Sequence, residues 1–466
     1  MKTTTLSALL PFSLVLALFS SKHMVVAANP DKHVEMEEAQ VREANEPFHP
    51  AEAGATGRFL KMSTMKKKKN KKKKKYYMKS MKSMKMSGKG KGKGKGIFQK
   101  LPPTPSPTPP RACFETNEEL RTAAERYVLG TPALKAQVQS VYGRRIGNWC
   151  VGQVTNFDSI FEDLSTFNEP LNNWDVSNAV SMNSMFDTAT FFNQPLDDWD
   201  VSSVTDMSEM FYDASFFNQP IGSWDVSSVT NMEDMFQYAV SFNQPIGNWD
   251  VSSVTNMNSA FEYAVSFNQP IGNWDVSAVI DTRGMFESAI SFNQPIGDWD
   301  VSSVEEMSFM FEAAVSFNQP IGDWDVSSVT DMAIMFERAA SFNQPIGDWN
   351  VSSLIDMDYM FFDAVAFNQP IGDWDVSSVT DMFSVFSGAL SFNQPIGTWE
   401  VSAANDVRRM FQGAVEFGMD LCDWGVHLDP AADVEDMFDG TNCPNTTDPN
   451  LSDVPPGPLC FECPSP

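Results

Sequence analysis

Apolar residues recur in a fixed order along most of the chain. In one representative segment Ile246, Trp249, Val251 and Val254 follow one another at spacings of three, two and three, and Asp250 stands between the Trp and the first Val. Side chains of a strand alternate between its two sides, so this spacing predicts a short strand at Trp-Asp-Val with an outward-facing aspartate.

The apolar positions after this strand follow a helical period. Met232, Met235, Phe236 and Ala239 stand at i, i+3, i+4 and i+7, a pattern that predicts about two turns of helix with one apolar face. The word Phe-Asn-Gln-Pro comes next, and its proline cannot continue a helix. Each unit is therefore predicted to be a strand, a helix and a turn. The asparagine of the turn, Asn243 for example, is expected to bond backbone groups of its own bend and of the neighbouring unit.

The same unit recurs every 25 residues. The 12 tryptophans of the chain are all 25 residues apart, at Trp149, Trp174, Trp199, Trp224, Trp249, Trp274, Trp299, Trp324, Trp349, Trp374, Trp399 and Trp424. A fixed period of this length is typical of a stack of repeats, in which each unit buries its apolar side chains against its neighbours. We therefore expect an α/β solenoid of about eleven 25-residue strand-helix-turn coils over residues 146–424, with the tryptophans as its structural core.

The repeated residues also resemble a known family. The order Ile-x-x-Trp-x-Val-x-x-Val is that of a leucine-rich-repeat strand with Trp at a leucine position, and the run VTDMxxMFxxAxSFNQPIGxWDVSS closely resembles the BspA-like leucine-rich-repeat surface proteins, especially those of microalgae. The resemblance covers residues 146–424. It implies a leucine-rich-repeat-like stack in a secreted or surface-displayed protein with binding and adhesion roles and no catalytic residues. It further implies a cysteine-flanked helical cap before the first coil.

Residues 113–145 are predicted to form that helical cap. Thr116 and Glu119 make a capping box for a first helix, which Gly130 would end, and Pro132 begins a second. The apolar side chains expected to face the first coil are Leu120, Ala124, Tyr127, Val128, Leu134, Val138 and Val141.

The period breaks near the other end of the chain. The phenylalanine that follows Phe411 in the pattern is Phe438, which is not 25 residues further on. A terminal repeat that departs from the pattern is typical of a cap. Residues 425–466 are therefore predicted to be a C-terminal cap with a Cys- and Pro-rich tail.

The cysteines stand outside the regular coils, at Cys113, Cys150, Cys422, Cys443, Cys460 and Cys463. In an oxidising compartment they favour disulfides that fix the two ends of the stack, first of all Cys113 with Cys150 and Cys422 with Cys443. Six cysteines allow fifteen pairings, and the pairing of Cys460 and Cys463 stays open. A zinc or redox site at these two residues is disfavoured, because no second Cys or His cluster accompanies them.

The chain begins with the features of a secretory signal. A lysine, an apolar stretch from Leu6 to Phe19 and small residues near Ala27 predict a signal peptide over residues 1–28. No stretch is long enough for a transmembrane helix, and the C-terminus lacks a lipid-anchor signal. We expect a protein secreted to the cell surface or extracellular matrix.

Charge divides the chain into opposite parts. Residues 113–466 contain 53 acidic and 9 basic side chains, whereas residues 61–100 contain 18 lysines and no acid. An acidic stack excludes nucleic acid as its partner. The lysine-rich arm of residues 61–100 is predicted to be disordered. Its expected partner is an anionic surface, a glycan or a mineral, and it is compositionally similar to the silica-associated silaffins.

Two further segments surround this arm. Residues 29–60 are acidic and lack a period, and residues 101–112 form a Pro-rich linker that is predicted to be extended. Asn350, Asn445 and Asn450 begin glycosylation sequons, which indicates that these positions are at the surface.

One aspartate recurs in nearly every predicted strand: Asp175, Asp200, Asp225, Asp250, Asp275, Asp300, Asp325 and Asp375. The favoured interpretation is that each bonds the backbone of the following Val-Ser-Ser, because Asn350, Glu400 and Gly425 interrupt the series. The alternative is a weak calcium ladder at Asp200, Asp225, Asp250, Asp275, Asp300 and Asp325, since hard cations prefer carboxylate oxygens. No other cofactor is expected.

The pattern argues against an enzyme. A catalytic site needs one distinct constellation, whereas the same residues recur in every coil, and His427 is the only histidine after residue 112. We therefore expect a non-catalytic repeat protein that binds proteins, glycans or further copies of itself. The alternative is a silica- or mineral-associated structural protein whose lysine-rich arm makes the contact.

Overall fold

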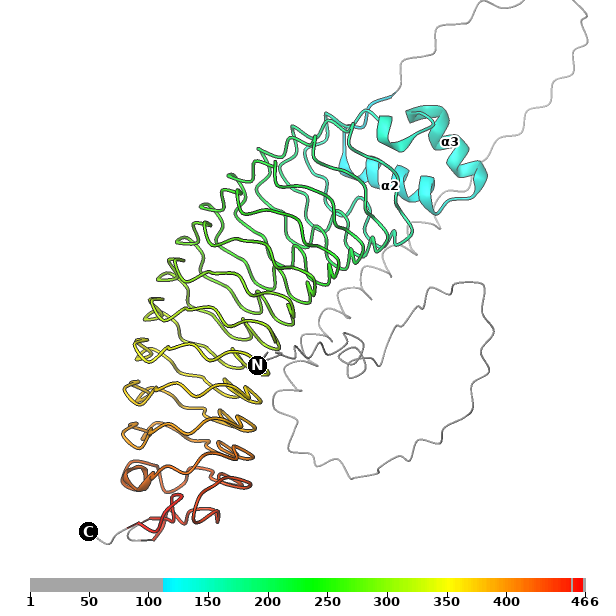
Figure 1. The fold of residues 1–466 in the computed structure, drawn as a ribbon. Coiled ribbons are helices and arrows are strands. Elements are labelled where there is room, and N and C mark those ends of the chain that lie inside the picture. Colours follow the sequence, from blue (N-terminus) through cyan, green and yellow to red (C-terminus); the bar gives the residue numbers. More distant parts are fainter. Residues whose placement is uncertain (1–111, 454–455, 464–466) are drawn as a thin grey trace, which may run out of the picture. The chain divides into compact units, whose positions relative to one another are not determined.

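The computed structural model describes residues 112–453 and 456–463 (Figure 1). The predicted signal peptide, the acidic segment 29–60, the lysine-rich arm and the Pro-rich linker up to residue 111 lie outside the described residues. The described residues belong to one compact unit. None of the helices that the structure describes is long and apolar enough to cross a membrane.

The described chain is a stack of coils, as the period predicts (Figure 1). Successive coils are joined by parallel bridges between single residues, which run through Asn156, Ser181, Asp206, Asn231, Asn256, Asp281, Glu306, Asp331, Asp356, Asp381, Asp406 and Asp433. The last step spans two residues more than the others. Even so, the ring of Phe438 lies 5.8 Å from that of Phe411 with the two planes 1° apart. The region predicted as the C-terminal cap therefore begins with a terminal coil that departs from the 25-residue period.

The strand and the helix predicted inside each coil are also wrong. Residues 150–421, all of which the structure describes, contain single bridges and turns but no helix and no longer strand. The segment that begins at Met232 shows why. The N–H groups of Met232, Asp234, Phe236 and Tyr238 donate to carbonyls of the next coil at 2.8–3.0 Å. Because every second N–H is used between coils, the i→i−4 bonds of a helix cannot form.

This alternation requires unusual backbone angles. Asp234 and Tyr238 have φ values of 56° and 60°, and the same two positions have positive φ in the other coils. Most of these residues are not glycine, and two of them, Thr188 and Ile334, are β-branched. A left-handed conformation costs such residues roughly 1–2 kcal/mol each, so the hydrogen bonds between coils and the core hold the backbone in a disfavoured form.

Aromatic rings form continuous columns through the core. The rings of Trp199 and Trp224 lie 6.4 Å apart with their planes 4° apart, and Phe211 and Phe236 stack at 5.6 Å. The indole Nε1 of Trp224 donates to the carbonyl of Leu196 in the preceding coil at 2.9 Å. All twelve tryptophans are at most 4% exposed, so the predicted structural core is confirmed.

A second column of side chains crosses the turns. Oδ1 of Asn243 accepts hydrogen bonds from the backbone N–H of Asn268 at 3.0 Å and from Nε2 of Gln269 at 2.9 Å, both in the next coil. Equivalent bonds recur along the stack. The predicted asparagine ladder is therefore confirmed in its bonds to the neighbouring coil.

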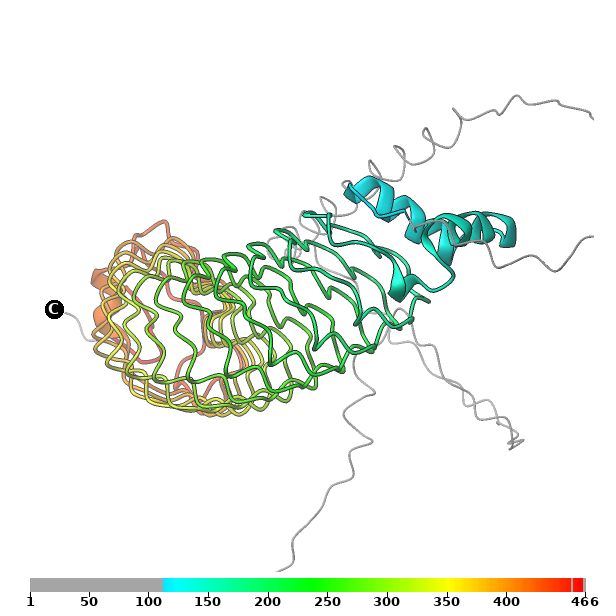
Figure 2. The same cartoon turned by 90° about the horizontal axis from the view of Figure 1, so that it is seen from above.

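The N-terminal cap has the two predicted helices (Figure 2). They are α2, Asn117–Val128, and α3, Pro132–Tyr142, and the short 3₁₀ helix η2, Ile146–Asn148, leads into the first coil. Thr116 caps α2 as expected, since its side chain accepts from the N–H of Glu119. Of the apolar side chains predicted to face the stack, Leu134 and Val141 are instead 38% and 43% exposed. Only one line of α3 faces inward, with Val138 buried and Tyr142 stacked on Phe114.

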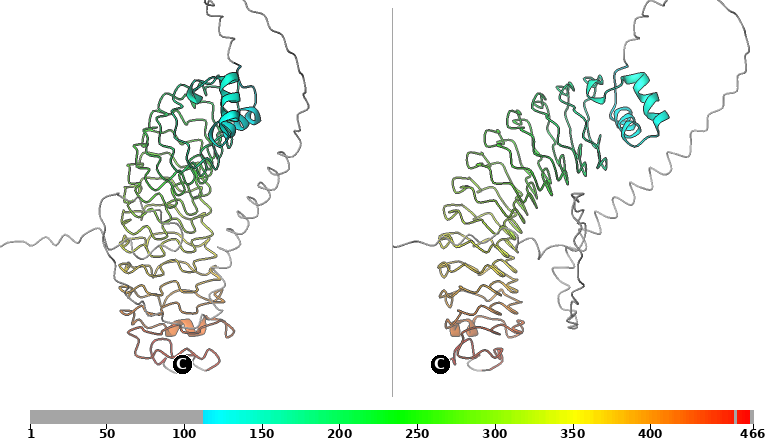
Figure 3. Two further views of the ribbon diagram at one scale, coloured as in Figure 1. Left: turned by 90° about the vertical axis from the view of Figure 1, so that its right-hand side faces the viewer. Right: turned by 45° about the vertical axis from the view of Figure 1, so that its right-hand side comes forward.

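The disulfides confirm one predicted pair and correct the other. Cys113 is bonded to Cys150 as predicted. The predicted Cys422–Cys443 bond is wrong, because Cys422 pairs with Cys463 and Cys443 with Cys460. The tail returns across the last coil after the 3₁₀ helix η3, Cys422–Val426, and the N–H of Asn445 donates to the carbonyl of Cys460. The red C-terminal segment lies at the end of the stack (Figure 3). Its return brings Cys463 to Cys422 and Cys460 to Cys443.

Candidate functional site

The first candidate is the aspartate column, which we define as Asp175, Asp200, Asp225, Asp250, Asp275, Asp300, Asp325 and Asp375. These side chains are exposed, and Oδ1 of each one accepts from the serine two residues later. At Asp250 the Ser252 hydroxyl donates at 2.6 Å and the Ser252 N–H at 3.1 Å. The favoured interpretation of a local turn cap is confirmed. The second oxygen of each carboxylate takes no part in these turn bonds, and the calcium ladder along Asp200–Asp325 stays a prediction.

Hydrogen bonding sets the charge of this column. The serine hydroxyl and then the serine N–H lower the pKa of Asp225, Asp250, Asp300, Asp325 and Asp375 below the usual value. Each hydrogen bond is made to the ionised form and therefore favours it. The aspartate column is thus a fixed line of negative charge at the surface.

A second acidic column, which the sequence analysis missed, lies at the bridges between coils. It comprises Asp281, Glu306, Asp331, Asp356, Asp381, Asp406 and Asp433. Several of these aspartates accept the N–H of the residue two positions later, as Asp381 does from Phe383 at 3.0 Å. Arg283 and Arg408 form ion pairs with Asp281 and Asp406. Only an acid at the same position in consecutive repeats could have revealed this column.

Three members of this region converge closely enough to hold a metal ion. Asp356, Asp358 and Asp381 each offer one oxygen, and these atoms lie within 4.8 Å of one another. Burial and then the neighbouring Asp356 raise the pKa of Asp358 to about 8, and burial also raises the pKa of Asp381. The donor set is all carboxylate, which suits calcium or magnesium rather than zinc or copper.

A third set, the glutamate column, is Glu262, Glu287, Glu312 and Glu337. These residues occupy one position in four consecutive coils, directly after a buried core phenylalanine. Glu312 is half-buried and the other three are buried. Burial, followed by repulsion from the neighbouring acids, raises the pKa of Glu312 to about 8 and raises that of Glu287 well above its usual value. A helix would have exposed this position, so the sequence analysis gave it no role.

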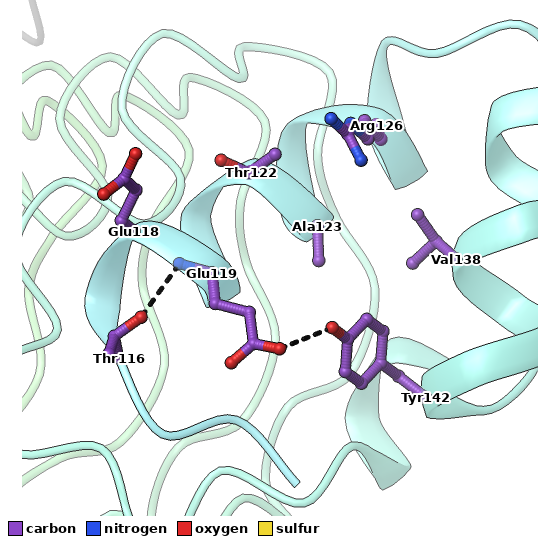
Figure 4. A pocket seen from close by; sticks show the side chains of 8 residues that line it. All are labelled: Thr116, Glu118, Glu119, Thr122, Ala123, Arg126, Val138 and Tyr142. Carbon is purple, nitrogen blue, oxygen red and sulfur yellow. Dashed lines mark hydrogen bonds between the residues drawn. The ribbon is translucent and has the colours of Figure 1, made fainter. Parts of the chain in front are cut away.

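A shallow groove lies between α2 and α3, with a volume of about 340 Å³ (Figure 4). Its polar side chains already bond one another. The hydroxyl of Tyr142 donates to Oε1 of Glu119 at 2.7 Å, and Oγ1 of Thr116 accepts from the Glu119 N–H. Burial and then Glu119 raise the pKa of Tyr142 to about 12. This groove therefore joins the two cap helices, and its groups are arranged for stability rather than for chemistry.

Other predicted surface residues lie apart from these columns. Asn350 and Asn450 are exposed, whereas Nδ2 of Asn445 donates to Oε1 of Glu462 at 3.0 Å. Nδ1 of His427 lies 3.1 Å from Oε2 of Glu400. Exposed apolar side chains form a further line at one position of the coil, with Val240, Val315, Val365, Leu390 and Val415 among them.

Comparison with known families gives a match over the same region. The model of a repeat family described as Mycoplasma protein of unknown function, DUF285, matches residues 133–246, 217–305, 267–369 and 342–450. These overlapping ranges cover the stack from the second cap helix to the coil beyond Trp424. No curated protein shows significant sequence similarity to the chain.

Proposed function

We propose a function from the premise that this chain belongs to the DUF285 repeat family, whose matches together span residues 133–450. The protein is a secreted, non-catalytic repeat protein of the cell surface or extracellular matrix. Its stack binds a repetitive protein or glycan partner, and its lysine-rich arm attaches it to an anionic surface. The BspA-like kinship of the repeats and a leucine-rich-repeat type of stack belong to this proposal.

The observation that carries the proposal is the repetition of one surface geometry. Each coil of the aspartate column presents a carboxylate held by its own serine, with the same bonds in coil after coil. A repetitive ligand can make one weak contact with each coil, and such contacts combine by avidity. A partner with regularly spaced cationic or hydroxyl groups would fit this surface best.

The disulfides support an extracellular location. Three disulfides close the two ends of the described stack, and such bonds persist in oxidising compartments. They agree with the secretory signal predicted over residues 1–28. Calcium is the one cofactor that this proposal admits.

The second candidate function is association with silica or another mineral. It rests on the arm, which has 18 lysines and no acid over residues 61–100. In this case the arm is the contact and the stack serves as a spacer.

A variant of the arm separates the two functions. The full chain is compared with a chain whose arm lysines are all replaced by glutamine, so that length is kept and charge is lost. Extracellular material from cells that express each chain is extracted with salt and chelator, and then by mineral dissolution. Adhesion through the stack predicts release of the full chain by salt or chelator and retained partner binding in the variant. Release of the full chain only with dissolved mineral, together with loss of retention in the variant, would replace the first function with the second.

A further inference from the structure

One coil departs from the aspartate column in its residue but keeps the structure of the turn. Asn350 takes the place of the aspartate, and its Oδ1 accepts from the Ser352 hydroxyl at 2.8 Å and from the Ser352 N–H at 3.3 Å. The corresponding distances at Asp275 are 2.6 and 3.1 Å. The turn therefore needs one side-chain oxygen, which asparagine supplies as aspartate does. What asparagine adds is an amide nitrogen, which takes no part in these turn bonds.

This amide nitrogen belongs to a glycosylation sequon at an outward-facing position. Asn350-Val351-Ser352 is the only sequon between residues 146 and 424 of the sequence. Trp349 and Val351, on either side of the asparagine, are 3% and 1% exposed, whereas Asn350 itself is exposed. An N-linked glycan is bulky and hydrated, so it needs a position at the surface. The aspartate column provides such a position, and only this coil combines it with an asparagine.

The other two sequons lie in the C-terminal tail. Asn445 is half-buried, and its Nδ2 donates to Oε1 of Glu462 at 3.0 Å. It also stands in the loop that the Cys443–Cys460 disulfide closes. Asn450 is exposed, but it is not a member of the column. Asn350 is therefore the sequon at which a glycan would act on the surface that the repeats share.

The place of Asn350 in the series gives a glycan a structural consequence. Seven consecutive coils, from Asp175 to Asp325, carry the aspartate before it, and Asp375 carries it after. Paired strands are about 4.8 Å apart, so an oligosaccharide of several sugars is longer than the step from one coil to the next. A partner that contacts successive coils would therefore be stopped at Asn350.

We propose that the chain carries an N-linked glycan at Asn350, and that this glycan confines a repetitive partner to the coils from Asp175 to Asp325. The inference rests on the proposed function, because glycosylation needs the secretory route and its consequence needs the aspartate column as the binding surface. In the covalent step, the Asn350 amide nitrogen bonds to the anomeric carbon of an oligosaccharide. The bond from that carbon to a lipid pyrophosphate breaks, and the amide proton leaves with the pyrophosphate.

Mass spectrometry of the full chain, produced in cells with an N-glycosylating secretory route, tests the modification. The peptide that contains Asn350 should carry the mass of an oligosaccharide. Ser352→Ala removes the sequon and should remove this mass, whereas Ser352→Thr keeps the sequon and should keep the mass. A chain in the medium with a bare Asn350 would overturn the inference and leave secretion intact. A chain retained inside the cells would contradict the proposed function and the inference with it.

A double variant tests the consequence by moving the glycan along the column. Asn350→Asp restores the aspartate, and Asp275→Asn creates the same sequon with Val276 and Ser277, so the net charge is unchanged. The longest run of aspartates without a glycan falls from seven coils to four. Binding of a lysine homopolymer to the glycosylated double variant should therefore be weaker by about tenfold than binding to the glycosylated wild type, since avidity falls with the number of contacts.

The single variant Asn350→Asp is the matched control. It has no glycan in the column and should bind the lysine homopolymer at least as tightly as the wild type does. Equal binding by the wild type and the double variant, with glycans present on both, would overturn the confining role of the glycan. If none of the three proteins binds the homopolymer, the column is not a surface for cationic partners, and the proposed function fails rather than the glycan assignment.

Discussion

The aspartate column and the glutamate column carry the same chemical group at the same 25-residue period, yet the protein holds them in opposite ways. Each exposed aspartate receives two hydrogen bonds from its own serine, as Asp250 does. These bonds lower the pKa of Asp225, Asp250, Asp300, Asp325 and Asp375. Gln237 bonds Glu262 at one end of the glutamate column and Arg338 pairs with Glu337 at the other, and burial raises the pKa values of Glu287, Glu312 and Glu337. The local donors and the burial at each position of the coil therefore decide the charge, and the residue type does not.

The largest effect should come from the core that both columns share. Trp299 is buried and stacks on Trp274 at 6.5 Å, and it directly precedes Asp300 of the aspartate column. Trp299→Ala should destabilise the protein by about 3–5 kcal/mol, because a large cavity forms in the middle of the stack. Hydrogen exchange should become faster in the coils on both sides of residue 299.

Val315→Ala is the matched control, since this side chain is 39% exposed. Its loss should cost less than about 1 kcal/mol. Equal effects of the two substitutions would mean that the columns do not depend on a common core.

The stability contributed by the glutamate column should depend on pH in a way that the aspartate column does not share. The pKa of Glu312 is raised to about 8 in the folded protein, against about 4.3 in an unfolded chain. Folding therefore favours the protonated form. The stability that Glu312 contributes is present below its pKa in the unfolded chain, about 4.3. It is lost as the pH rises through its pKa in the folded protein, about 8. In calcium-free buffer, the urea midpoint of the protein should fall over this range.

Glu312→Gln should flatten this pH dependence and stabilise the protein by about 1–3 kcal/mol at high pH, because a half-buried charge beside other carboxylates is removed. Asp300→Asn is the control. Asn350 already makes the equivalent bonds to Ser352, so this variant should keep the urea midpoint of the wild type and its fall with pH. If the urea midpoint of Glu312→Gln falls with pH as much as that of the wild type, the glutamates are not the source of the pH dependence.

The smallest effect concerns the backbone beside Glu312. Ala313 has φ of 50°, a conformation that favours glycine, whereas the buried Ala314 has no positive φ. Ala313→Gly should therefore be neutral or stabilising by up to about 1 kcal/mol. Ala314→Gly should destabilise by roughly 0.5–1 kcal/mol, since it adds freedom to the unfolded chain without relief of strain. Chemical unfolding of the two variants compares them, and a loss in both would contradict a left-handed position at Ala313.

The sequence predicts the parts of this fold that depend on burial and on local caps. Trp249 and its equivalents lie in the core, Thr116 caps α2, and Cys113 pairs with Cys150. The first two follow from side-chain chemistry at one place in the chain, and the disulfide follows from two cysteines that flank the cap helices.

The parts that the sequence analysis missed depend on contacts between distant residues. The apolar spacing of Met232, Met235, Phe236 and Ala239 fits a helix, but the same side chains also point inward from a run of turns whose N–H groups bond the next coil. The pairing of Cys422 with Cys463 depends on the return of the tail. The glutamate column depends on the same turns, because they direct a position inward that a helix would expose.

The bonds between coils also affect how the gene can change. The indole of each tryptophan from Trp174 onward donates to a carbonyl 28 residues earlier. In each coil from that of Phe157 to that of Phe411, backbone N–H groups of the turn donate to carbonyls of the equivalent turn in the next coil. Duplication or deletion of one 25-residue interior unit would leave every remaining coil with neighbours of the same kind. Unequal recombination could therefore lengthen or shorten the stack in whole steps. The disulfide-closed ends would be unaffected, and related proteins should differ in length by multiples of one unit.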